Sequence, residues 1–219
     1  MVAHYTEDLN WLGNLPQSIQ QTVYDKNPDT PHAGATPLPN VGREAHTYLT
    51  HIVRHYDSLS EWTVFCQGKP FDHAYDFKKR LKAWAEEGDI IPDFEWLGHI
   101  IDTDDANGER LFKQWSKNEN QRGLDLIGFH QALFETESPD SYTFALGAQF
   151  IISRELLQKK PLVFYQHALR LSVDFPDAAH CYERSWNRVF GIDTPLLPVG
   201  QLTAYLKPIR AKIGIEEGK

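Results

Sequence analysis

The sequence has little cysteine and no surplus of positive charge. Its 219 residues include two cysteines, Cys66 and Cys181, which lie far apart and match no metal-ligand spacing, so both are expected to be buried small side chains. The formal net charge is −8 at pH 7. Because nucleic-acid binding depends on an excess of Lys and Arg over one surface, this charge argues against a nucleic-acid partner.

Long apolar runs, internal repeats and low-complexity tracts are also missing. A membrane-spanning helix needs roughly 20 consecutive apolar residues, and no segment approaches that length, so no membrane span is predicted. The first residues lack a basic stretch followed by an apolar one, which predicts a cytoplasmic protein without a secretory signal. The length suits one hydrophobic core, and we expect a single domain over residues 1–214 with a frayed tail over residues 215–219.

The first 90 residues alternate between β-rich and helical patterns. Strands are predicted at residues 2–5, 18–24 and 62–66, and helices at residues 9–12, 40–56 and 74–87. The loop over residues 25–40 is long enough to be a functional flap. This alternation predicts a single α/β domain with a mainly parallel sheet flanked by helices, in which ligands bind beyond the carboxyl ends of the strands.

The second half of the sequence is less regular. Residues 94–101 fit a strand or extended chain, residues 102–109 a polar loop, and residues 124–134 a helix. An apolar segment over residues 142–152 is interrupted by Gly147, and a glycine inside a strand often marks a bulge or the close approach of another group. Two further helices are predicted, one opened by Pro161 and one over residues 178–191.

The turn over residues 67–73 is the first candidate site, because it follows an apolar strand and gathers amide, carboxylate and imidazole groups. Asp72 beside His73 could bind a metal ion or act as a proton-transfer pair. In the alternative interpretation, Asp72 caps the following helix and His73 is partly exposed.

A second acidic candidate is the pair Asp102 and Asp104, whose alternate carboxylates could share a hard cation such as Mg²⁺ or Mn²⁺. A solvated turn is the alternative, since the Asn107-Gly108 pair is typical of turns.

Two polar residues interrupt apolar patterns near the carboxyl end of the chain. Glu183 borders an apolar helical stripe, which suits either a general base or a structural ion pair with a neighbouring arginine. Gln149 interrupts an apolar strand, so it is either a satisfied core amide or a ligand contact.

Five segments together resemble a family known only as a domain of unknown function: residues 2–12, 40–49, 64–73, 147–154 and 183–191. That family looks like a distant relative of the GT-A type glycosyltransferases, which transfer a sugar from a nucleotide diphosphate. The resemblance implies a Rossmann-like GT-A scaffold, with an Asn-x-Gly segment at Asn40 opening a helix and Glu183 as the base near the acceptor.

This sequence departs from the GT-A pattern where the metal-binding Asp-x-Asp would stand, because Gln67-Gly68-Lys69 occupies that place. Without a divalent ion, Arg43, Lys69 or Arg154 would have to neutralise the leaving diphosphate. The candidate ligand-binding residues are Tyr5, Asn40, Arg43, Gln67, Lys69, Gln149 and Arg154.

The leading hypothesis is a nucleotide-sugar-dependent glycosyltransferase, with Glu183 or Asp72 as base, His73 holding substrate or metal, and Mg²⁺ or Mn²⁺ as candidate cofactor. One rival is a catalytically silent carbohydrate-binding domain, for which Trp11, Trp62, Trp96 and Trp186 could stack on sugars. Another is a metal-assisted hydrolase that uses Asp72, His73 and the Asp102 cluster.

Overall fold

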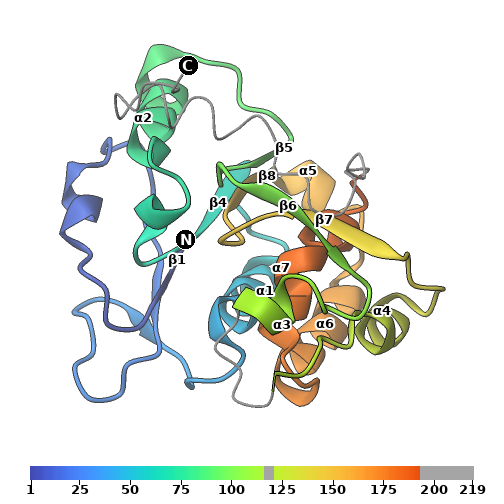
Figure 1. Ribbon diagram of the computed structural model, residues 1–219. Coiled ribbons are helices and arrows are strands. Elements are labelled where there is room, and N and C mark those ends of the chain that lie inside the picture. Colours follow the sequence, from blue (N-terminus) through green and yellow to red (C-terminus); the bar gives the residue numbers. More distant parts are fainter. Residues whose placement is uncertain (116–120, 193–219) are drawn as a thin grey trace, which may run out of the picture.

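The structure is a computed structural model that describes residues 1–115 and 121–192 (Figure 1). Within these ranges, eight strands form two sheets: β1 (Val2–His4), β2 (Val23–Asp25), β3 (Thr36–Pro37), β4 (Trp62–Gln67), β5 (Phe94–Trp96), β6 (Ile101–Asp105), β7 (Ser141–Ala145) and β8 (Phe150–Ser153). The helices are α1 (Arg43–His55), α2 (Phe77–Lys82), α3 (Phe112–Trp115), α4 (Leu126–Phe134), α5 (Arg154–Leu157), α6 (Leu162–Asp174) and α7 (Ala178–Val189). Short helical turns cover Asn10–Asn14, Pro70–Asp72 and Ala83–Glu87.

The larger sheet has six strands in the order β3-β2-β1-β4-β8-β5. The pairs β3-β2, β2-β1 and β1-β4 are parallel, whereas β8 runs antiparallel to both β4 and β5. The predicted α/β fold with a mainly parallel sheet is therefore confirmed. The smaller sheet pairs β6 with β7 in antiparallel register.

The chain changes direction across the larger sheet between β1 and β4. From β1 it steps to β2 and β3 on one side, and α1 then carries it back to β4 on the other side. In open α/β sheets, ligands bind in the crevice beyond the carboxyl ends of the strands at such a reversal. The fold therefore places a potential binding crevice after His4 and Gln67, the last residues of β1 and β4.

Alternate side chains of β4 enter two different hydrophobic clusters. Phe65 packs with Tyr48 of α1, Phe150 of β8 and Trp186 of α7, and the ring centroids of Phe65 and Phe150 are 5.1 Å apart. Cys66, the next residue, packs in a second cluster with the first helical turn and α2. This alternation is the two-residue period of a strand, and it shows that the sheet is covered on both faces.

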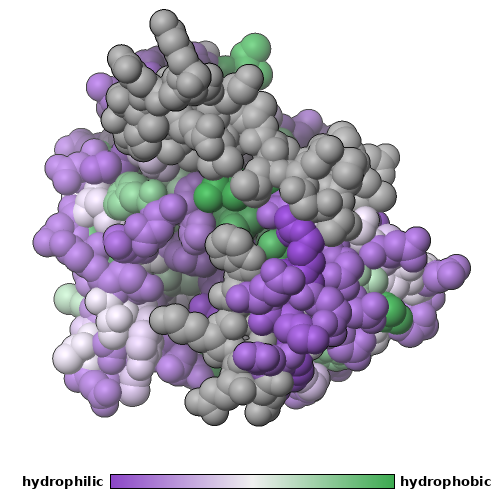
Figure 2. Space-filling model, in the orientation of Figure 1, coloured by the Kyte–Doolittle hydropathy of each residue, from purple (hydrophilic) through white to green (hydrophobic). Residues whose placement is uncertain are grey.

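Both cysteines are buried and free, as the sequence predicts. Hydrophilic residues predominate on the described part of the face in Figure 2, and hydrophobic ones form separate patches among them. Within the described ranges, every helix is too short or too polar to traverse a bilayer.

The predictions for two strands and one loop are wrong. The strand predicted at residues 18–24 is confined to Val23–Asp25, and the apolar segment over residues 142–152 is divided between β7 and β8, which lie in different sheets. Residues 102–105, predicted as a polar loop, belong to β6. Asp102 and Asp104 are tolerated in this strand because Arg110 and Arg184 pair with them.

The start of α1 also differs from the prediction. Gly42, with φ of 59°, takes the position expected for Asn40, and a β-carbon there would collide with the carbonyl oxygen of Ser172 in α6. The polar side chains of His46 and Thr50 are buried because α1 packs against α6, α7 and the sheet.

Candidate functional site

The first half of the candidate site lies where β1 and β2 end. Nδ1 of His4 lies 3.0 Å from Oδ1 of Asp25, and both side chains are buried. Asp25 also accepts backbone hydrogen bonds from Asn27 and His32. Burial raises the pKa of Asp25, but these hydrogen bonds and His4 outweigh it, so the pKa lies below its ordinary value. Asp25 is therefore held as a carboxylate at the carboxyl end of β2.

The second half of the site is organised around Gly147, in the turn between β7 and β8. The amide of Gly147 donates to Oε1 of Glu183 at 2.8 Å, and its carbonyl oxygen accepts from Nε2 of Gln67 at 3.3 Å. His73 lies against the same residue, because a β-carbon built on Gly147 would stand 2.6 Å from the imidazole ring. Three side chains from β4, the following turn and α7 thus contact one glycine.

Glu183 is oriented by more than the Gly147 amide. Its Oε2 lies 3.6 Å from Nη1 of Arg184, and Nε of Arg184 donates to Oδ2 of Asp104 at 2.8 Å. The guanidinium also stacks over the ring of Phe144, 4.7 Å from its centroid. The side chains of Asp104 and Arg184 are buried, whereas that of Glu183 is 21% exposed. Glu183 is therefore fixed on one side and open to solvent on the other.

Further charged groups gather at the start of α1. Nζ of Lys26, which follows β2, donates to the carbonyl oxygens of Val41 and Arg43, and burial lowers its pKa to about 8 although Glu44 acts in the opposite sense. Burial raises the pKa of Glu44, and the charge of Glu183 raises it further, while Arg43 and Lys26 lower it. These shifts connect the start of α1 electrostatically with Glu183.

Arg43 extends from this helix start towards α7. Its guanidinium Nη1 lies 3.1 Å from Nε2 of His180, one turn before Glu183, and its side chain is 66% exposed. The structure therefore brings together Gln67, His73 and Glu183, with Arg43 bordering the group.

The other candidates from the sequence differ in their exposure and their partners. Lys69 and Asp72 form an exposed ion pair of 3.1 Å at the turn after β4. Tyr5 and Asn40 are exposed. Gln149 is fully buried and donates to the carbonyl oxygen of Pro70 at 3.0 Å, so it supports this turn as a core amide.

Arg154 lies at the opposite edge of the sheet. Its backbone amide donates to the carbonyl oxygen of Glu61, and its guanidinium donates to the carbonyl oxygen of Leu59. Strand β4 begins at the residue after Glu61. The six residues of β4 span about 16 Å at the usual rise of a strand. Arg154 therefore cannot contact a small ligand that also contacts Gln67, and its expected role in neutralising a diphosphate is not supported by its position.

The three carboxylates among the candidate metal ligands are each paired with a cation of the protein. Oδ1 of Asp102 accepts from Arg110 at 2.8 Å, Asp104 pairs with Arg184, and Asp72 pairs with Lys69. Among residues 1–115 and 121–192, no three His, Cys, Asp or Glu side chains are grouped so that they could hold a metal ion. A divalent ion does not fit these side chains as they are arranged.

The tryptophans expected to stack on sugars are not equally accessible. Trp186 is completely buried among aromatic rings, and Trp11 is buried with Nε1 donating to the carbonyl oxygen of Gly68 at 2.8 Å. Trp62 and Trp96 are partly exposed. Trp11 and Trp186 are therefore core residues.

Sequence reasoning missed several residues of this region. His4, Asp25 and Lys26 come at strand ends, and their place next to predicted strands was the signal that could have found them. Nε2 of His99 lies 2.7 Å from Oδ1 of Asp76, and the amide of His99 donates to the carbonyl oxygen of His73 at 2.8 Å. The pairing of His99 with Asp76 had no local sequence signal, because 23 residues separate them.

Fold and site together define a mixed α/β domain with a polar site at the carboxyl ends of its parallel strands. Residues 1–87 match a family described as a protein of unknown function (DUF3431). The matched residues include β1, α1, β4 and the turn with His73, but neither Gly147 nor Glu183. No curated protein and no solved structure matches the chain.

Proposed function

We propose that the chain is a glycosyltransferase of the GT-A type, or an enzyme descended from one, that takes a nucleotide-sugar donor at the carboxyl ends of β1 and β4. The observation that carries the proposal is the contact of Gln67, His73 and Glu183 with Gly147, beside the point where the strand order reverses. Polar groups from distant parts of a chain that meet at such a point are typical of a binding site.

Glu183 is the base in this proposal. An acceptor hydroxyl gives its proton to the Glu183 carboxylate as its oxygen bonds to the anomeric carbon of the sugar. The bond from that carbon to the diphosphate oxygen breaks as the new bond forms, and the nucleoside diphosphate leaves with the electron pair. Glu183 suits this role because the Gly147 amide and Arg184 orient it while part of its side chain stays open to solvent. Asp72 suits it less, because its side chain is 59% exposed and paired with Lys69.

The leaving diphosphate needs positive charge, and two exposed cations border the site. Arg43 stands at the start of α1, and Lys69 follows β4. Their side chains are 66% and 62% exposed, so both can turn towards an anion, and exposed ion pairs contribute only about 0–1 kcal/mol. We assign charge neutralisation to Arg43 and Lys69.

Calorimetry against nucleoside diphosphates and their sugars, with and without Mn²⁺, tests the proposal. We expect binding of at least one of them to the wild-type chain and about tenfold weaker binding to Arg43→Gln, as one lost charge-assisted contact of roughly 1.4 kcal/mol implies. Arg154→Gln is the matched control at the other edge of the sheet and should bind normally. Absence of heat from every compound, or equal loss in the two variants, would overturn the proposal.

Glu183→Gln separates catalysis from binding. This variant keeps the size of the side chain and an oxygen for the Gly147 amide, but it loses the proton acceptor. We expect it to bind the donor like the wild type and to lose at least 100-fold in transfer rate, within the usual contribution of a general base.

A further inference from the structure

A cavity lies at the other end of the parallel strands, away from the candidate site at their carboxyl ends. Its volume is about 510 Å³, within the range of small-molecule pockets. The segment before β2, the end of α1, the start of β4 and the helix α2 contribute its lining. Trp11 and Trp62 contribute to its lining, whereas Arg43, Gln67, His73 and Glu183 do not.

The cavity exists because β1 is shorter than its neighbour. β1 begins at Val2 and pairs only with Cys66 and Gln67, the last two residues of β4. The earlier residues of β4 pair with β8 on the opposite side. Between the start of β4 and residues 20–22 the sheet therefore leaves a gap, which the cavity occupies.

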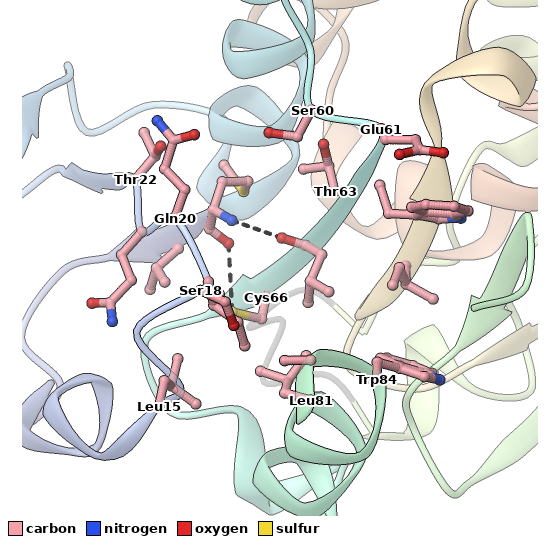
Figure 3. Close-up of a pocket in the computed structure, with 18 of the residues that line it drawn as sticks. Leu15, Ser18, Gln20, Thr22, Ser60, Glu61, Thr63, Cys66, Leu81 and Trp84 are labelled. Carbon is pink, nitrogen blue, oxygen red and sulfur yellow. Dashed lines mark hydrogen bonds between the residues drawn. The ribbon is translucent and has the colours of Figure 1, made fainter. Parts of the chain in front are cut away.

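The two sides of the cavity differ in chemistry (Figure 3). Hydroxyl, amide and carboxylate groups line one side, from Gln20, Thr22, Ser60, Glu61 and Thr63. Leu15, Leu81 and Trp84 line the opposite side, with Ser18 and Cys66 between the two. A ligand that fills this cavity would need an apolar body and a hydrogen-bonding head.

The charge of the lining restricts that head. Glu61 is the charged carboxylate among the described lining residues, and no lysine or arginine lines the cavity there. The amine of Met1 donates to the carbonyl oxygen of Val64 at 2.8 Å, and burial lowers its pKa. Burial also lowers the pKa of His51 to about 3, so this imidazole is neutral. Arg80 is not among the lining residues, because its guanidinium lies over the ring of Trp84 and pairs with Glu95.

We propose that this cavity binds an aliphatic amphiphile whose head donates hydrogen bonds and carries no negative charge, such as a long-chain alcohol or amine. The head lies against Glu61 and the neighbouring hydroxyl groups, and the chain packs on Leu81 and Trp84. An anionic head is disfavoured, because it would lie beside the Glu61 carboxylate, and the described lining residues include no lysine or arginine to pair with it. This binding site is independent of the glycosyltransferase proposal.

Decanol, decylamine and decanoate test the proposal as probes of equal chain length, below their aggregation limits. Calorimetry and tryptophan fluorescence should detect decanol and decylamine, with decanoate at least tenfold weaker. Glu61→Lys should reverse the order of decylamine and decanoate. Equal affinity of the wild type for decanol and decanoate, or no binding of any probe by either method, would overturn the proposal.

A pair of tryptophan substitutions locates the probe. Ser18→Trp places a large ring between the two sides of the cavity, whereas Gln17 is exposed and outside the lining, so Gln17→Trp is the matched control. Ser18→Trp should weaken decanol binding at least tenfold, and Gln17→Trp should leave it unchanged. Equal effects would place the probe elsewhere. If Ser18→Trp instead dissociated a dimer in light scattering while no probe bound, the cavity would belong to an interface between two copies and the proposal would fall.

Discussion

Replacing Gly147 with alanine should disturb the point at which the candidate site is held together. Gly147 has φ of +90°, a conformation that side-chain-bearing residues rarely adopt. The added β-carbon would also stand 2.6 Å from two ring carbons of His73 and 2.8 Å from its β-carbon. The substitution therefore carries both a backbone cost and a steric cost.

The two costs can be separated with a control glycine. Gly34 has φ of +81° and nothing within 4 Å of a built β-carbon, so Gly34→Ala carries the backbone cost alone. Left-handed backbone costs about 1–2 kcal/mol for a residue with a side chain, and overpacking adds about 1–3 kcal/mol. We expect Gly147→Ala to lower the free energy of unfolding by about 2–5 kcal/mol and Gly34→Ala by about 1–2 kcal/mol. The unfolded-state gain from alanine is common to both variants.

Urea unfolding of the single variants and of the pair Gly147→Ala/His73→Gly measures the steric part. Removing the imidazole together with its β-carbon makes room for the new methyl group, so the double variant should recover about 1–3 kcal/mol relative to the sum of the single effects. Equal costs at Gly147 and Gly34, or additive effects of the two changes, would refute the close contact between Gly147 and His73.

Three further predictions concern stability and reactivity. Asp104→Ala leaves the buried Arg184 without its partner and should cost about 3–5 kcal/mol in urea unfolding, whereas Asp72→Ala, at an exposed pair, should cost less than about 1 kcal/mol; similar costs would contradict the assignment. Burial, together with the charges of the terminal amine and a neighbouring imidazole, lowers the pKa of His51 to about 3, so its imidazole is protonated on unfolding below pH 6.5. Its contribution to stability is present above pH 6.5 and is lost towards pH 3 by up to about 1.4 kcal/mol per pH unit, and His51→Gln should flatten the slope between pH 7 and 5. Burial raises the pKa of Cys66 to about 12, so little of this cavity-lining thiol is ionised, and a disulfide reagent should label it far more slowly in the folded chain than in urea; equally rapid labelling of the folded chain would contradict this.

The elements of the first half of the chain could be predicted because their patterns are local. The helix at α1 and the strand at β4 carry their periodicity within a few turns or residues, and both appear where the sequence places them, apart from the cap at Gly42. The carboxyl-end position of Gln67 follows from the same pattern, since a parallel sheet aligns strand ends.

The second half could not be predicted to the same degree, because its polar residues are balanced by distant partners. Asp104 lies in a buried strand through its pairing with Arg184, 80 residues further along the chain. Arg154 follows an apolar strand just as Gln67 does, but β8 runs antiparallel, so its end lies at the opposite edge of the sheet. Strand direction is a tertiary property that no local pattern encodes.

The most direct test of the central claim is a crystal structure of the chain soaked with a nucleoside diphosphate sugar. Our account predicts the diphosphate between the ends of β1 and β4 and the start of α1, with Arg43 in contact and the sugar facing Glu183. A ligand bound only at the other edge of the sheet, or His73 and Glu183 on opposite sides of the molecule, would contradict it.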